Sequence, residues 1–467
     1  MRAKIKIHIV LVIAILLLSF ILVSCQIDTQ TEENYLSLEN PSLQQGDTII
    51  SVIDFNLAAQ SFAVLDALWD TDNGALWGMT LHMPMIIACE ITRDAVSSHP
   101  FGTVFMPQLV DDLVIYAGTL PDHLFVSNTA VTMHGYRWGM VTWRSMKELA
   151  DDETERLRLL SHEGFHALQP QLFGGFYSTM STSSSRDTEG AQISYILEIA
   201  ALVAAWNTTE NERLESINDA LYIRNARRQA YNTSVDENLL EVLEGLAMYT
   251  EIMLTLSYSE IKAEVNAWTE VLLGLEFRVE IAWGYFSGAL YGLLLDEFNT
   301  DWRTDAIDAH TDLGRLLQEA AEISELAPPI DLERYGYANI VIITQSRIIE
   351  HERQVQAALD ALTQPQIRLP VLPNYGQEID DIIVLSSDNS DWIEFVIRAG
   401  VLTCHWGRLE VEDGYLLNVS RRGHFILSAP SFETVGNRIY GDGWVLELDD
   451  LWELYPEGDG FVTRQRE

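Results

Sequence analysis

Two histidines and a glutamate lie close together in the stretch LLSHEGFHALQP (159–170), which contains the pattern HExxH. If this stretch is helical, His162 and His166 are four residues apart and project from the same face, so both imidazoles can reach one ion. Glu163 is next to the first imidazole and can take a proton from a water on that ion. The pattern predicts a zinc centre with Glu163 as the general base. The alternative is two histidines that fall at this spacing on an amphipathic helix without a metal.

The neighbouring residues favour a helix. The acidic run 151–153 suits the positive N-terminal end of a helix, and Pro170 is expected to stop it after Gln169. The segment ETERLRLLSHEGFHALQ (153–169) is therefore predicted to form one helix that presents both histidines.

Catalytic zinc usually has three protein ligands and one open position, so a third ligand is required. Two later segments with helical periodicity offer a glutamate. Glu198 is the only charge in AQISYILEIAALVAAW, and Glu244 begins EGLAMY within ENLLEVLEGLAMYTEIMLTL. A lone carboxylate in an apolar helix must be paired, protonated or bound to a metal, so Glu198 stays open as an alternative ligand.

The pair of motifs HEGFH and EGLAMY resembles the gluzincin metallopeptidases. In that family, a helix with HExxH is followed by a helix whose glutamate, often in the form EGxA, is the third zinc ligand. The resemblance implies a zincin-like fold, Zn²⁺ as the cofactor, His162, His166 and Glu244 as ligands and Glu163 as the catalytic base. It covers only the catalytic helices, and the connection from His166 to Glu244 is much longer than in compact gluzincins.

The resemblance also implies roles outside the ligand set. Glu198 would then contact a metal ligand without binding the metal itself, or it would pair with an arginine such as Arg224 or Arg228. The oxyanion-stabilising group of the family could be any of three tyrosines, for each of which a buried structural role is the alternative. The segment YRWGMVTW (136–143) stands where gluzincins place a substrate-binding edge strand. The three tyrosines are Tyr249, Tyr285 and Tyr291.

The N-terminus predicts export and attachment to a membrane. A basic start is followed by an apolar run from Ile9 to Val23 and then by Leu22-Val23-Ser24-Cys25, which resembles the lipobox of bacterial lipoproteins. Residues 1–24 are then a signal peptide, and Cys25 is the lipidated residue. An uncleaved anchor helix is the alternative, and it also places the rest of the chain outside the cytoplasm. Of the other cysteines, Cys89 and Cys404 could pair in an oxidising compartment.

Composition and periodicity divide the remaining chain. Polar residues 25–47 predict a flexible tether, and 48–362 a metallopeptidase region that is β-rich over 48–144 and helical over 145–362. Residues 366–467 alternate short β-type runs with turn residues and predict a small all-β domain. The expected fold class is α+β. In 281–295, Gly284, Gly288 and Gly292 predict a buried helix that another element approaches closely.

Acidic residues outnumber basic ones by 69 to 29, and the net charge of -40 disfavours nucleic acid as a partner. The sequence therefore predicts a membrane-anchored, extracytoplasmic zinc metallopeptidase that acts on peptides or proteins. The alternative is a cell-surface lipoprotein that uses a zincin-like scaffold and the C-terminal β domain for binding, or a zinc hydrolase with a non-peptide substrate.

Overall fold

The computed structural model describes most of the chain from residue 51 onwards. The described residues are 51–102, 105–121, 124–133, 135–173, 188–275, 279–298, 301–304, 308, 310–371, 375–385, 394–419, 424–458 and 460–466. The predicted signal peptide, Cys25 and the predicted tether lie outside them. The fold is a mixture of helix and sheet with an all-β C-terminal region, as α+β predicts. No described helix has both the length and the apolar composition needed to cross a membrane.

The chain forms two compact units. The first contains residues 1–88, 94–119 and 126–346, and the second contains 89–93, 120–125 and 347–467. The boundary falls within the long helix α13 (Tyr337–Ala361), so the second unit begins before the predicted all-β domain at 366. The second unit also contains the short segments 89–93 and 120–125, which belong to the region predicted to be the metallopeptidase.

The first described element of the first unit is a helix, which the prediction of a β-rich region over 48–144 missed. Helix α2 (Phe55–Asp72) starts where the Asp54 side chain accepts hydrogen bonds from two backbone N–H groups of the first turn. It ends at Asn73, whose φ of 45° is left-handed. Its buried face has helical spacing and consists of Ala58, Phe62, Leu65 and Trp69.

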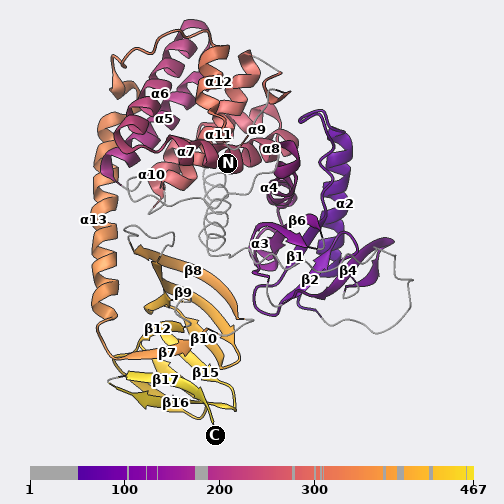
Figure 1. The fold of residues 1–467 in the computed structure, drawn as a ribbon, viewed down its shortest axis with the longest axis vertical. Coiled ribbons are helices and arrows are strands. Elements are labelled where there is room, and N and C mark those ends of the chain that lie inside the picture. Colours follow the sequence, from indigo (N-terminus) through magenta and orange to yellow (C-terminus); the bar gives the residue numbers. More distant parts are fainter. Residues whose placement is uncertain are drawn as a thin grey trace. The chain divides into compact units, whose positions relative to one another are not determined.

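A six-stranded sheet follows, with α2 lying along it (Figure 1). Its strands are β1 (Met85–Ala88), β2 (Asp94–Ser97), β3 (Met106–Val110), β4 (Leu113–Thr119), β5 (Thr129–Met133) and β6 (Tyr136–Thr142). The order is β3-β4-β2-β1-β6-β5, and only the β1–β6 pair is parallel.

Strand β6 is an interior strand of this sheet. It pairs with β1 on one side and β5 on the other, so the prediction that 136–143 is an edge strand is wrong, and β5 is the edge. The sequence does not indicate this pairing, because β1 and β6 are far apart in the chain.

The helix with HExxH, α4 (Glu153–Leu172), begins as predicted but ends later. The Asp152 side chain accepts from the N–H of Glu155 at its start. Pro170 lies inside the last turn and does not end the helix, which was expected to stop after Gln169. In that position, proline removes the backbone hydrogen bond to the carbonyl of His166 and crowds that carbonyl, and the helix continues for only two more residues.

From residue 143 to 361, every described element is helical. They are α3 (Trp143–Glu148), α4, α5 (Glu189–Asn207), α6 (Glu210–Tyr231), α7 (Ser234–Leu240), η2 (Glu241–Gly245), α8 (Leu246–Thr255), α9 (Tyr258–Val265), α10 (Trp268–Gly274), α11 (Val279–Phe298), η3 (Trp302–Thr304), α12 (Leu313–Ala320), η4 (Leu332–Tyr335) and α13. The segments α7, η2 and α8 follow one another without a break. Element η2 is a π-helical turn, in which the N–H of Leu246 bonds to the carbonyl of Glu241.

Helix α11 is buried in the centre of these helices, and its glycines meet the π turn. A Cβ on Gly288 would lie 2.5 Å from the carbonyl oxygen of Glu241, and one on Gly245 would lie 2.5 Å from the Cα of Gly288. The two backbones therefore touch with no side chain between them. Gly245 serves this contact with α11.

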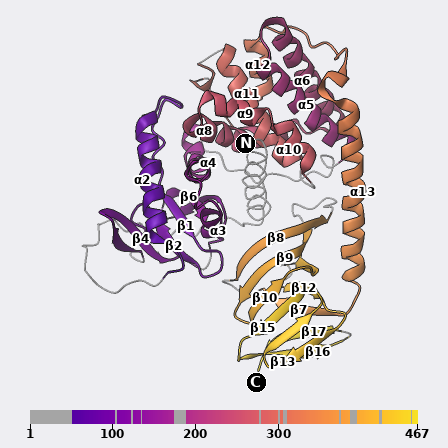
Figure 2. The same cartoon turned by 180° about the vertical axis from the view of Figure 1, so that it is seen from behind.

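The second unit contains an all-β sheet (Figure 2). Its strands are β7 (Gln366–Pro370), β8 (Gly376–Leu385), β9 (Glu394–Cys404), β10 (Gly407–Val411), β11 (Leu416–Val419), β12 (His424–Ser428), β13 (Phe432–Val435), β14 (Arg438–Gly441), β15 (Trp444–Leu448), β16 (Trp452–Glu457) and β17 (Gly460–Gln465). Their order is β13-β14-β15-β10-β9-β11-β12-β7-β17-β16, with β8 paired to β9. Cys89 and Cys404 are free thiols, so the disulfide left open by the sequence is not formed.

The contact between α11 and the π turn can be tested with one added methyl group. Gly288→Ala places a Cβ against the Glu241 carbonyl, and overpacking of this kind costs about 1–3 kcal/mol of unfolding free energy. Gly274→Ala is the control, because nothing lies within 4 Å of its Cβ position, and it should change stability by less than about 1 kcal/mol. Urea unfolding of the two variants measures the difference. Equal effects would contradict the close approach.

Candidate metal centre

Helix α4 lies directly on the sheet because glycines remove the side chains between them. A Cβ on Gly139 of β6 would lie 2.9 Å from the carbonyl oxygen of Glu163, and one on Gly164 would lie 2.9 Å from the ring of Trp69. The sheet and α2 thus fix the side of α4 that carries Gly164. His162 and His166 turn towards the helix α7–η2–α8 instead.

The structure brings His162, His166 and Glu244 together. The Oε2 atom of Glu244 is 3.3 Å from Nε2 of His162 and 3.2 Å from Nε2 of His166, and one ligand atom from each residue lies within 4.8 Å of the others. Ligands bound tetrahedrally to zinc at about 2.0–2.1 Å are about 3.3 Å apart. The spacing of the two measured pairs therefore fits a zinc ion.

The orientation of His162 is set by Glu251 of α8. Its Nδ1 is 2.9 Å from Oε2 of Glu251, which accepts a hydrogen bond when ionised, so Nδ1 must carry the proton. In the neutral imidazole, Nε2 then has a lone pair, and this lone pair faces Glu244. Sequence reasoning missed Glu251.

The orientation of His166 is set by Gln169 in the same way. The Nε2 group of Gln169 donates to the backbone carbonyls of Val242 and Leu243, at 3.1 and 2.7 Å, which fixes the amide so that its Oε1 faces His166. That oxygen is 2.9 Å from Nδ1 of His166 and can only accept. Nε2 of the neutral His166 is therefore also a lone pair that faces Glu244.

When both imidazoles are neutral, three lone-pair atoms therefore meet with no proton between them. Two imidazole nitrogens and a carboxylate oxygen in contact repel one another unless the imidazoles are protonated or a cation lies among them. This donor set, with both Nδ1 atoms held by acceptors, is the arrangement by which proteins prepare histidines for zinc.

The electrostatics of the site favour positive charge. Burial lowers the pKa of His162, but hydrogen bonds to Glu244 and Glu251 outweigh it and raise the pKa to about 10. Burial raises the pKa of Glu244, yet the imidazoles of His166 and His162 bring it well below the usual range. A proton and a metal compete for the same lone pair, so carboxylates that strengthen proton binding also strengthen metal binding.

Glu163 lies beside this cluster and has an unusual environment. It is 1% exposed, and its Oε2 has no hydrogen-bond partner among the described residues. Burial raises the pKa of Glu163 to about 7, against the opposing effect of the two imidazoles. A carboxyl with this pKa can both accept and release a proton near neutral pH.

A buried ion-pair cluster stands behind Glu251. Arg158, one turn before His162 on α4, donates to Glu251 and to Glu264 of α9 at 2.8 and 2.7 Å and also contacts Glu155. It neutralises part of the charge on Glu251 and ties α4 to α8 and α9. Arg158 and Glu264 were not predicted, because only the packing of these helices brings them together.

Of the three candidate tyrosines, Tyr285 is the one at the cluster. Its ring stacks on His162 with centroids 5.7 Å apart, and burial together with the nearby Glu244 carboxylate raises the pKa of its hydroxyl. The hydroxyl of Tyr249 bonds to Asp296, and that of Tyr291 bonds to Glu198.

Glu198 lies in a different cluster and is not placed to bind the same ion. Its carboxylate is 3.2 Å from Arg224 and 2.6 Å from Arg227, and it accepts hydrogen bonds from Trp283 and Tyr291. The arginine partner expected from the sequence is therefore Arg224, joined by Arg227. Arg228, the other arginine considered, contacts Glu237 and Asp312.

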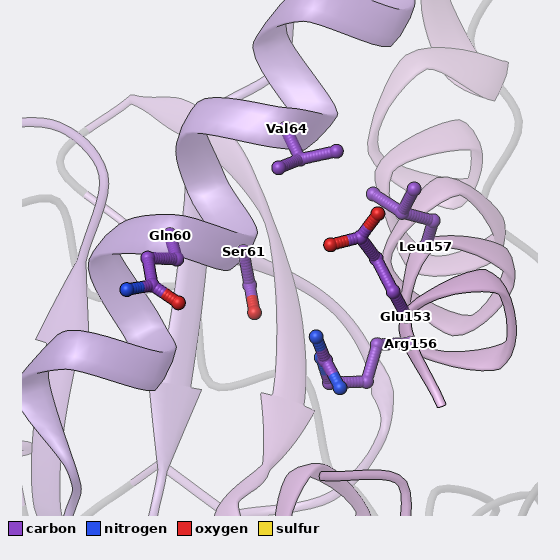
Figure 3. Close-up of a pocket in the computed structure, with 6 residues that line it drawn as sticks. All are labelled: Gln60, Ser61, Val64, Glu153, Arg156 and Leu157. Atoms are coloured by element: carbon purple, nitrogen blue, oxygen red, sulfur yellow. The ribbon is translucent and has the colours of Figure 1, made fainter. Parts of the chain in front are cut away.

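A small cavity between α2 and α4 is separate from this site (Figure 3). It is lined by Gln60, Ser61, Val64, Glu153, Arg156 and Leu157. Its volume of about 10 Å³ is comparable to the space that one water needs. It is too small to hold a substrate.

Comparisons with protein-family models, curated proteins and solved structures find no match to this chain.

Zinc binding by this cluster is testable through stability. Zinc at about 100 times its Kd would stabilise the folded protein by about 2.7 kcal/mol, and Glu244→Ala should lose this effect together with stoichiometric zinc. Glu198→Gln, which alters an equally buried carboxylate outside the cluster, should keep both. Thermal unfolding with and without zinc, together with metal analysis, makes the comparison. Zinc retained by Glu244→Ala would remove Glu244 from the site.

Proposed function

We propose that the protein is a zinc metallopeptidase of gluzincin type, in which His162, His166 and Glu244 hold the metal. The observation that carries the proposal is Glu163, a buried carboxylate beside the three converging ligand residues. The Oε2 atom of Glu163 has no hydrogen-bond partner within the part of the chain that the structure describes. Burying an unpaired carboxylate oxygen costs folding free energy, and a role in proton transfer beside the three ligand residues gives a reason for its position. A general base needs that atom free.

The residues divide the chemistry among them. Zinc, when bound, supplies Lewis acidity, which lowers the pKa of water and polarises a carbonyl. Glu163 takes a proton at Oε2 and can return it to the leaving amine. The hydroxyl of Tyr285, which faces Glu244, is the nearest candidate donor for a developing oxyanion. Glu251 and Gln169 keep the two imidazoles in the tautomer that leaves Nε2 free.

A structural metal site is the second candidate, because the cluster is deeply buried. The side chain of His162 is 0% exposed, that of Glu244 is 7% and that of His166 is 11%. Structural zinc, however, is usually closed by four protein ligands, whereas the described residues supply three. His166 is the most exposed of the three ligands, so a substrate would reach the metal from the side of His166. A site with three protein ligands leaves one position open, which favours catalysis.

The proposed setting follows from the N-terminal sequence. A lipobox-like segment ending at Cys25 favours attachment to a bacterial membrane through a lipid, with the enzyme outside the cytoplasm. Peptides or proteins there are the proposed substrates. The net charge of -40 favours neither nucleic acid nor anionic lipid surfaces as partners.

Glu163→Gln separates catalysis from metal binding. The amide keeps the shape of the side chain but cannot take a proton, so we expect unchanged zinc content and peptide hydrolysis lowered by at least about 100-fold. A mixed peptide library, analysed by mass spectrometry with and without a chelator, measures the cleavage.

The outcomes distinguish the two candidates. Cleavage by the wild type that a chelator and Glu163→Gln both abolish supports the peptidase. Stoichiometric zinc with no cleavage of any peptide supports a structural metal. Cleavage that persists in Glu163→Gln would contradict the role of Glu163.

A further inference from the structure

The π turn that carries Glu244 is also held by a buried charge cluster to which the histidines do not belong. Both Glu241 oxygens accept hydrogen bonds from Arg224, at 2.5 Å each. Both side chains are nearly inaccessible to solvent, at 0% and 1%. Arg224 also contacts Glu198 and Asp312, so it is anchored independently of Glu241. Glu241 is the first residue of the π turn, three positions before the proposed ligand.

The π turn lets these two glutamates face different partners. In an α-helix with about 100° per residue, positions three apart lie only about 60° apart around the axis. Glu241 and Glu244 would then point towards the same neighbours. The wider π turn rotates Glu244 farther round, so that Glu241 meets Arg224 while Glu244 meets His162 and His166.

The same turn is connected to the second histidine. Its carbonyls at Val242 and Leu243 accept hydrogen bonds from Gln169, whose Oε1 orients His166. A change in the path of the π turn therefore moves Glu244 directly and disturbs His166 through Gln169. The glycine contact with α11 leaves the backbone no side chains that could take up such a change.

We propose that Glu241, held by Arg224, is a positioning residue that sets the π turn and thereby the placement of Glu244 and His166 on the metal. The inference rests on the metal site of the proposed function, but it concerns metal affinity and geometry and not turnover. Sequence patterns give no hint of it, because Glu241 reads as an ordinary glutamate in a helix.

Glu198 provides a matched control. Glu198 and Glu241 are both 0% exposed, and both accept from the same Nη1 atom of Arg224. Glutamine at either position removes one buried negative charge from the same cluster. Only Glu241 belongs to the π turn, so a general loss of stability affects both variants, whereas a positioning effect is confined to one.

The test compares Glu241→Gln, Glu198→Gln and the wild type as purified full-length proteins. Zinc affinity is measured by competition with a chromophoric chelator, and the visible spectrum of the Co²⁺-loaded protein reports the coordination geometry. We expect Glu241→Gln to weaken zinc binding by about 10- to 100-fold, the range typical of residues that position metal ligands. Its Co²⁺ spectrum should differ from that of the wild type. Glu198→Gln should bind zinc within about twofold of the wild type and keep its spectrum.

Thermal unfolding of the metal-free proteins measures how far each substitution lowers the stability of the fold, and this loss is compared with the loss of zinc affinity. Both variants are expected to melt below the wild type. If both weaken zinc equally, or if Glu241→Gln keeps wild-type affinity and spectrum, the positioning role is overturned. A wild type that binds no zinc overturns it as well. Weakened binding in Glu241→Gln alone supports it even if no peptide is cleaved, in which case only the proposed function fails.

Discussion

The constraint on which the site depends is the convergence of two imidazole nitrogens and a carboxylate oxygen, which is favourable only when positive charge lies among them. Nε2 of His162, Nε2 of His166 and Oε2 of Glu244 are in contact, and the Nδ1 protons of both imidazoles already point to acceptors. Such a group is repulsive unless it holds positive charge. The surrounding structure is arranged to keep these atoms together despite that repulsion, which is why a cation is the natural occupant.

Two kinds of contact impose this arrangement, close glycine packing and buried charge clusters. Glycines let α4 lie against the sheet and let α11 touch the π turn, so the backbones that carry the ligands are close-packed. Two buried charge clusters then fix the helices from behind, one around Arg158 and the other around Arg224. Buried charges of this kind contribute little net stability but penalise any arrangement that leaves one unpaired. They therefore favour a single placement of the ligands.

The sequence predicted what depends on local spacing. Positions four apart on one helix bring His162 and His166 together whatever the rest of the fold, and the residues EGLA singled out Glu244. It could not predict contacts that depend on which helices face one another, such as those of Glu251, Gln169 and Arg158. For the same reason, it left the choice among the three tyrosines open. Helix α2 was not predicted because other segments of 48–144 alternate apolar and polar residues as strands do. The apolar face of α2 itself nevertheless has helical spacing.

The central claim is tested most directly by X-ray diffraction from crystals grown with zinc and recorded on both sides of the zinc absorption edge. The account predicts a single strong anomalous peak between the two Nε2 atoms and the carboxylate of Glu244, with bond lengths of about 2.0–2.2 Å. A map with no peak there, while His162, His166 and Glu244 keep their mutual contacts, would contradict it.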